Sequence, residues 1–134
     1  MKKLITVAAL LLCITAIHSQ TLLNFCTGVD AKGNCTFNNT KYITSPDSVN
    51  GTIFMEVSGN GNNINTTKIV MMVYSVNAMG KEKLDTTFEQ PIQSDWMYAW
   101  RSYAFKSPGK YDVKVFNDAG QMICSKALEM LLWK

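Results

Sequence analysis

The sequence predicts an all-β protein, a single antiparallel β-sandwich of about seven strands, and three observations support this. Past residue 39, short apolar runs rich in β-branched and aromatic residues alternate with clusters of Gly, Asn, Asp and Pro. The apolar residues show no long helical period. The runs recur at the spacing typical of a sandwich, with no linker, internal repeat or low-complexity tract between them.

The first 19 residues have the layout of a secretory signal peptide. Lys2 and Lys3 precede an apolar run that ends at Ile17, and a short polar stretch with the small residue Ser19 follows. The run is shorter than the roughly 20 apolar residues that a membrane helix needs. We therefore expect residues 1–19 to be removed and the rest to be secreted, periplasmic or on the cell surface, without an integral membrane segment.

Cys13 leaves a second interpretation of this leader open. A cysteine inside a signal sequence can become the lipid-bearing first residue of a bacterial lipoprotein. Because Leu12 stands where that motif has a small residue, the sequence favours the released form.

Removal of the leader changes the charge of the chain. The whole sequence has 13 Lys and Arg against 10 Asp and Glu, a net charge of +3. Without Lys2 and Lys3, 11 basic residues face 10 acidic ones, and the net charge falls to +1. So balanced a chain offers no electrostatic attraction to nucleic acid or to an anionic membrane. The remaining 115 residues are enough for one domain with its own core.

Histidine is absent from the predicted mature chain, since the only one, His18, lies in the leader. Ser-His-Asp and Cys-His mechanisms need an imidazole that exchanges protons near neutral pH. Histidine-ligated metals are excluded for the same reason, and the remaining cysteines form no CxxC pair. We expect neither an enzyme, nor a cofactor, nor a metal.

Three cysteines remain after the leader. Cys26 and Cys35 flank "TGVDAKGN", a turn-forming stretch that makes them a candidate disulfide, although the sequence allows three pairings. Cys124 lies in the last apolar run and is expected to be a buried free thiol. We assign residues 20–39 to an N-terminal segment that holds the candidate disulfide loop, and residues 40–134 to the sandwich domain.

The expected strands cover residues 41–44, 51–58, 69–76, a segment between Gly80 and Pro91, 96–105, 110–116 and 121–131. The second strand alternates, with Ile53, Met55 and Val57 on one face and Thr52, Phe54 and Glu56 on the other. The third is apolar on both faces, which predicts a central strand covered on both sides or one that faces a partner.

The stretch "YAFKSPGKYDVKVFNDAGQ" resembles the closing hairpin of immunoglobulin-like bacterial sandwiches of the PKD and fibronectin type III kind. The resemblance implies an immunoglobulin-like sandwich and no particular function. It assigns Phe105 and Tyr111 to the core, Gly109 and Gly120 to turns, and Val113 and Val115 to the face toward the opposite sheet.

Three blocks, "NFCTGVDAKGN", "SDWMYAW" and "PGKYDVKV", are also similar to small uncharacterised exported proteins of Bacteroidetes. That resemblance implies no known activity. The closing strand is similar as well to a sandwich that serves as a C-terminal sorting tag in the same bacteria.

The stretch "DWMYAWRSYAF" holds the candidate binding residues. Strand alternation places Trp96, Tyr98 and Trp100 on one face, and we expect this face to point outward because the other carries Phe105. Exposed aromatic rings suit stacking on sugars or anchoring a protein partner. Arg101 is a candidate for a cation-π or carboxylate contact beside them, or else a solvated strand residue. A bulge that turns at least two rings into the core is the open alternative.

The leading hypothesis is an exported, non-enzymatic recognition or adhesion module that binds a glycan or a protein. The alternative is a structural subunit whose apolar strand 69–76 and last strand pack against copies of itself or a partner at the cell surface or in the periplasm.

Overall fold

The computed structural model describes residues 21–44, 52–105 and 107–132, so the predicted signal peptide lies outside the described ranges. Within these ranges the chain forms ten strands. None of the described residues belongs to a helix that is long and apolar enough to cross a membrane.

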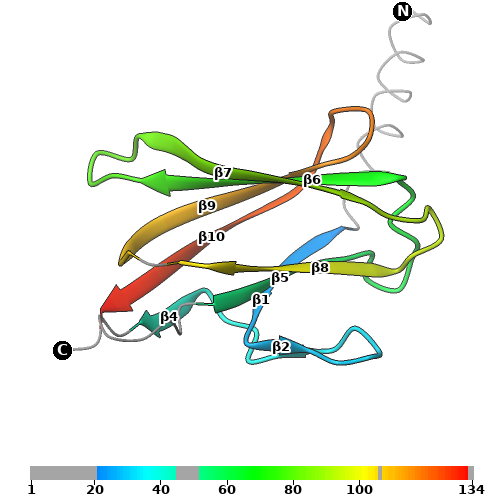
Figure 1. Cartoon of the computed structure of the whole chain (residues 1–134), viewed down its shortest axis with the longest axis horizontal. Coiled ribbons are helices and arrows are strands. Elements are labelled where there is room, and N and C mark those ends of the chain that lie inside the picture. The colour runs from blue at the N-terminus through cyan, green and yellow to red at the C-terminus, as the bar shows by residue number, and fades with distance from the viewer. Residues whose placement is uncertain (1–20, 45–51, 106, 133–134) are drawn as a thin grey trace, which may run out of the picture.

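The strands form two packed sheets and a short ribbon (Figure 1). The small sheet has the order β1-β5-β8, with bounds Leu22–Cys26, Thr52–Ser58 and Tyr98–Ala104. The large sheet has the order β4-β10-β9-β6-β7, with bounds Lys41–Thr44, Met122–Leu132, Gly109–Phe116, Lys68–Val76 and Glu82–Pro91. The ribbon pairs β2 (Gly28–Val29) with β3 (Cys35–Thr36). The predicted all-β sandwich is therefore confirmed.

One strand pair departs from the antiparallel arrangement that the sequence predicts. β4 runs parallel to β10, with Lys41 opposite Glu129, whereas all other paired strands are antiparallel. The chain leaves the small sheet after β1, forms the ribbon, and joins the edge of the large sheet at β4. This change of sheet brings the early part of the chain beside its last strand.

The seven expected strands are present as β4 to β10, with most ends displaced by one or two residues. The sandwich, however, does not begin at residue 40. β1 pairs along its whole length with β5, and Leu23 and Phe25 on β1 are buried in the core. The predicted domain boundary at residue 40 is wrong because the segment 20–39 combines a core strand with a turn-rich loop, and the loop dominates the composition of the segment.

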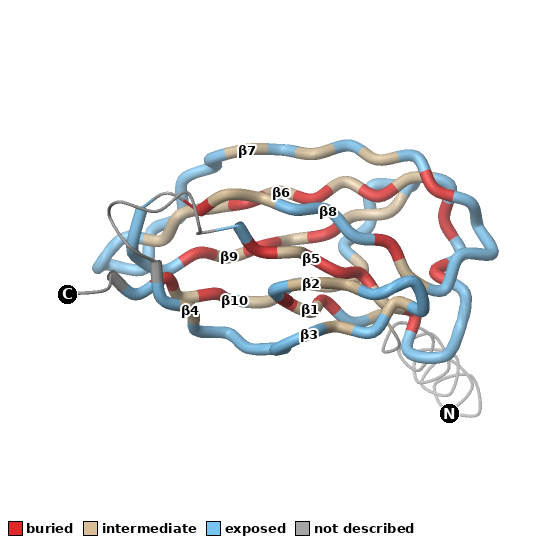
Figure 2. The backbone as a smooth tube through the Cα atoms, turned by 60° about the horizontal axis from the view of Figure 1, so that its bottom comes forward, coloured by how far each residue is buried: buried red, intermediate tan, exposed pale blue. Residues whose placement is uncertain are grey.

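Alternation along the strands builds the core between the two sheets (Figure 2). The small sheet contributes Leu23, Phe25, Ile53, Met55, Val57 and Ala99, and the large sheet contributes Ile69, Met71, Val73, Tyr111, Val113, Val115, Leu128 and Met130. Phe105 closes one end and contacts Tyr103 and Tyr111 edge to face, at centroid distances of 4.7 and 4.8 Å. The core positions expected for Phe105, Tyr111, Val113 and Val115 are those observed.

β6 is central in the large sheet, between β7 and β9. Its inward residues Ile69, Met71 and Val73 are buried, whereas the outward residues Val70, Met72 and Tyr74 are only half-buried. In Figure 1 no described strand packs over this outer face. β6 is thus central within its sheet, and the described strands cover it on one side only.

Candidate functional site

The candidate aromatic residues lie at the start of β8, an edge strand of the small sheet. β8 begins at Tyr98, so Trp96 belongs to the preceding turn, where its carbonyl accepts a hydrogen bond from the Ile64 amide at 2.8 Å. Ala99 points into the core, which turns Tyr98 and Trp100 outward. Trp96 and Trp100 are 40% and 41% exposed. The pairing of β8 with β5 has no register shift, so Trp100 is not drawn into the core, and Trp96 in the preceding turn is exposed as well.

Tyr98 is not a free ring, because the ribbon covers it. Its hydroxyl donates a hydrogen bond of 2.7 Å to the carbonyl of Ala31. A Cβ atom on Gly33 would lie 2.4 Å from the Tyr98 ring, and Gly33 also has a φ of +80°. Glycine is therefore required at the point where the ribbon meets this ring. Tyr98 ties the ribbon to β8, and the expected row of three open rings reduces to two tryptophans.

A cleft of about 540 Å³ opens beside these residues, where β7 and β8, the edge strands of the two sheets, lie next to each other. Its lining consists of Gln90, Trp96, Met97, Tyr98, Ala99 and Trp100. Apart from the Gln90 amide, these side chains are aromatic or apolar. The cleft can therefore hold an apolar or aromatic group and offer it few directed hydrogen bonds.

Arg101 lies on the opposite face of β8 from Trp100. Its guanidinium stands 4.2 Å from the centroid of the Phe88 ring on β7, so it bridges the two edge strands. Phe88 in turn contacts Tyr103 edge to face at 5.5 Å. The expected cation-π contact exists, but with Phe88 and not with the tryptophans, because consecutive strand residues point to opposite faces. Arg101 is thus separated from the outward rings.

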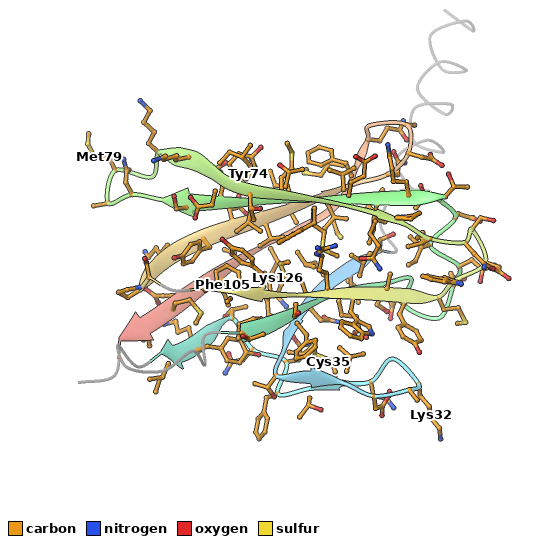
Figure 3. All side chains as sticks on the ribbon, in the orientation of Figure 1. Lys32, Cys35, Tyr74, Met79, Phe105 and Lys126 are labelled. Carbon is orange, nitrogen blue, oxygen red and sulfur yellow. A yellow bond between two sulfur atoms is a disulfide. The ribbon has the colours of Figure 1, made fainter. Side chains whose placement is uncertain are left out.

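Cys26 and Cys35 form a disulfide with a Cα–Cα distance of 5.4 Å. The bond joins the end of β1 to the start of β3 and folds the ribbon over the outer face of the small sheet. Figure 3 shows the ribbon on the side away from the large sheet, with Cys35 at its base and Lys32 near its tip. Cys124 is free and packs against the core, and burial raises the pKa of its thiol to about 12. That thiol is therefore protonated at neutral pH.

Glu56 is the residue that the sequence analysis missed. It occupies an outward position on β5, yet only 2% of it is exposed. Asn24 on β1 donates a hydrogen bond of 3.3 Å to Oε1, whereas Oε2 has no hydrogen-bond partner among the described residues. Burial raises the pKa of the Glu56 carboxyl. Strand alternation alone predicts a solvated position here, and no local signal shows that a loop returns to cover it.

Ligand-type atoms of Cys26, Cys35 and Glu56 gather within 4.8 Å of one another. The two sulfur atoms are bonded to each other, and a disulfide does not supply the thiolates that bind zinc. In the oxidised protein this cluster is a disulfide beside a carboxyl group and not a metal centre.

Three other acidic residues, Asp30, Glu82 and Glu89, have structural partners. Asp30 accepts hydrogen bonds from the backbone amides of Lys32 and Asn34 and from the Asn34 side chain, which shapes the ribbon turn and lowers the pKa of its carboxyl. Glu82 pairs with Lys114 at 2.9 Å, and Glu89 pairs with Lys68 at 2.7 Å. These carboxylates do not converge on a reaction centre.

A scan against protein-family models matches no family, and a search of curated proteins finds no match. Among solved structures, the chain is similar to an immunoglobulin-like protein of Pseudomonas aeruginosa, with a TM-score of 0.53 and 10% sequence identity. The similarity covers 84% of this chain and 98% of that protein. At this identity the likeness concerns the fold alone. The narrower resemblances, to PKD or fibronectin type III modules and to Bacteroidetes proteins, stay predictions. Together with the two packed sheets, the likeness shows that this chain folds as an immunoglobulin-like β-sandwich.

Proposed function

We propose that this chain is an exported, non-enzymatic recognition module that binds its partner in the cleft beside Trp96 and Trp100. The immunoglobulin-like fold is one that binding and structural modules use, although a fold does not define a ligand. The observation that carries the proposal is the meeting of two half-exposed tryptophans with Met97 around one cleft. Tryptophans in such a position are the side chains that most often dominate binding energy at an interface.

The lining favours a protein partner over a glycan. A sugar site combines aromatic stacking with several polar groups that bind hydroxyls, whereas this cleft presents one side-chain amide, that of Gln90, besides two indole N–H groups and the Tyr98 hydroxyl, which is already bonded to Ala31. An apolar side chain of a partner protein needs little more than the area that Trp96, Met97 and Trp100 provide. The glycan alternative is the second outcome of the test.

The test replaces Trp100 with a photo-crosslinking phenylalanine analogue in the chain lacking residues 1–19, and places the same analogue at Phe37 as control. Phe37 is 77% exposed, forms no ring contact that the structure records and lies outside the cleft. A protein adduct formed from position 100 and absent from position 37 supports protein recognition.

A panel of immobilised glycans is probed in parallel with the unmodified chain and with Trp100→Ala. Binding that Trp100→Ala abolishes, while Phe37→Ala retains it, assigns the cleft to glycans. If neither experiment depends on Trp100, the cleft is not the recognition site and the proposal fails.

The outer face of the large sheet favours a second candidate, a structural subunit. Half-buried Val70, Met72 and Tyr74 lie on the outer face of β6, with Tyr74 opposite exposed Leu84 on β7, and exposed Leu131 lies opposite exposed Ile43. Figure 3 shows Tyr74 on this side of the sandwich. Sedimentation velocity tests this candidate: self-association that rises with concentration and is lost in Met72→Lys supports it, and a monomer at all concentrations contradicts self-association.

A further inference from the structure

The cluster of Glu56 with the disulfide is not explained by ligand binding in the cleft. Buried carboxyl groups are costly unless hydrogen bonds compensate, and Glu56 has one bond to Asn24 and an unpartnered Oε2. A neutral side chain would fill the same space on β5 without that cost. A function that uses the proton of the Glu56 carboxyl group would explain why an acid occupies this position.

Desolvation is the main effect that favours the protonated form of Glu56, and it outweighs the hydrogen bond from Asn24, which acts to lower the pKa. Its neighbours in register, Asn24 on β1 and Trp100 on β8, are uncharged. The charged group that acts on it from the ribbon is Asp30, whose negative charge adds to desolvation in raising the pKa of the Glu56 carboxyl. No cation contributes to this shift. Glu56 thus holds its proton at a higher pH than an ordinary glutamate.

The two cysteines beside this acid differ in exposure. Cys35 is partly exposed at the base of the ribbon, whereas Cys26 at the end of β1 is fully buried. We therefore expect a thiolate arriving from solvent to attack the Cys35 sulfur, with the Cys26 sulfur as the leaving group. A thiolate released in the interior is desolvated and needs a proton.

We propose that the Cys26–Cys35 bond is an exchange-competent disulfide and that Glu56 is the acid that protonates the Cys26 sulfur as the bond opens. The thiolate of a thiol-bearing partner, a small thiol or a protein cysteine, attacks the Cys35 sulfur and forms a new S–S bond to it. The Cys26–Cys35 bond breaks, its electron pair stays on the Cys26 sulfur, and the Glu56 proton moves there. The products are a mixed disulfide on Cys35, a Cys26 thiol and a Glu56 carboxylate.

This inference is independent of the ligand proposed for the cleft. Opening of the disulfide has one structural consequence, because this bond holds the ribbon against the small sheet. The remaining attachments of the ribbon to the small sheet include the hydrogen bond from the Tyr98 hydroxyl to the Ala31 carbonyl.

The first experiment measures the rate at which dithiothreitol reduces the disulfide in the folded chain, followed by quenched alkylation and site mapping by mass spectrometry. Rates are divided by the concentration of dithiothreitol thiolate. We expect Glu56→Gln to lower the rate at pH 6 by about tenfold or more, as loss of a general acid does. Glu89→Gln, which removes an exposed carboxylate outside this cluster, is the matched control and leaves the rate unchanged.

The pH dependence separates an acid from a structural residue. In the natural chain the rate per thiolate falls as pH rises through the pKa of Glu56, because the acid loses its proton. In Glu56→Gln the same plot is flat. A flat plot for the natural chain overturns the proposal, as does an equal rate for Glu56→Gln.

A second pair of variants tests which sulfur is attacked. Cys26→Ser and Cys35→Ser lose the same bond, so any loosening of the ribbon is common to both. With glutathione disulfide, we expect a mixed disulfide on Cys35 in Cys26→Ser to form at least tenfold faster than one on Cys26 in Cys35→Ser. Equal rates, or a faster reaction at Cys26, would contradict the assigned order of bond breaking.

Discussion

The outer faces of the two sheets differ, although both are the solvent side of the same sandwich. On the small sheet the disulfide ribbon covers β5 and β8, so that Glu56 is buried and Tyr98 is bonded to the ribbon. On the large sheet no described strand covers β6, and half-buried Met72 and Tyr74 lie beside the partly exposed ion pair of Lys114 with Glu82. The covered face holds polar groups in the interior, and the open face holds apolar groups near water. Strand alternation alone would place the polar groups of the covered face in solvent. It would likewise not place apolar groups on the solvent side of the open face.

Removal of the disulfide should change stability the most, because it releases the ribbon and makes the covered face resemble the open one. We expect the Cys26→Ser, Cys35→Ser double variant to lose about 2–3 kcal/mol of unfolding free energy, the value for a short closed loop. Urea denaturation measures the loss. Cys124→Ala is the control for a cysteine outside the pair. A loss no larger than that of the control would mean that the ribbon contributes little to stability.

The next largest effect is the pH dependence of stability that Glu56 confers. Burial raises the pKa of its carboxyl, so above the pKa of the unfolded chain the folded state keeps a proton that the unfolded state has lost. Stability therefore falls as pH rises from about 4 through the folded pKa. We expect Glu56→Gln to remove this fall and to be more stable than the natural chain at pH 7, on the order of 1 kcal/mol.

Denaturation curves from pH 4 to pH 8 measure the effect. The open face supplies the control, because Glu82 is exposed and its pKa is lowered by Lys114. Glu82→Gln should leave the decline above pH 4 in place. If the natural chain becomes more stable between pH 5 and pH 8, Glu56 is not held protonated in the folded state.

Two tyrosines compare the faces directly. The Tyr98 hydroxyl donates a bond of 2.7 Å to Ala31 on the covered face, whereas the Tyr74 hydroxyl on the open face has only a 3.6 Å contact with the Met72 sulfur. We expect Tyr98→Phe to cost about 0.5–1 kcal/mol and Tyr74→Phe close to none. Hydrogen exchange should also quicken in residues 28–36 of Tyr98→Phe alone. Equal costs would show that the ribbon is held without this bond.

The ion pairs of the open face should have the smallest effect. Lys68 and Glu89 meet at 2.7 Å, but both side chains are exposed. We expect Glu89→Gln to change the unfolding free energy by no more than about 0.5 kcal/mol, and less in 0.5 M salt. Thermal denaturation at low and high salt measures this. A loss above about 1 kcal/mol would show that charge pairing stabilises the open face more than its exposure implies.

Much of the fold could be read from local patterns. Seven strands, the hairpin around Gly120 and the core positions of Phe105 and Tyr111 follow from alternation and turn chemistry, which depend on residues close in sequence. β1 was missed because five residues before a turn-rich loop carry too short a pattern to stand out. The parallel pairing of β4 with β10 joins segments almost 90 residues apart, and no local pattern encodes it.

The candidate site divides in the same way. The outward direction of Trp100 and the inward direction of Ala99 follow from the period of two along β8. Three features of the site each depend on a second segment from elsewhere in the chain. They are the cover over Tyr98, the partner of Arg101 and the burial of Glu56.

The sequence by itself determined the all-β class, most strands, and which residues of each strand face the core, because these follow from interactions between neighbours along the chain. Only the tertiary structure decided which outer face is covered. A ribbon joined by Cys26–Cys35 folds back on the small sheet, and its path depends on the disulfide, the Gly33 contact and the Tyr98 hydrogen bond acting together. Burial is a property of that assembled path and not of any one residue, which is why Glu56 looks like a surface residue in the sequence and is an interior acid in the fold.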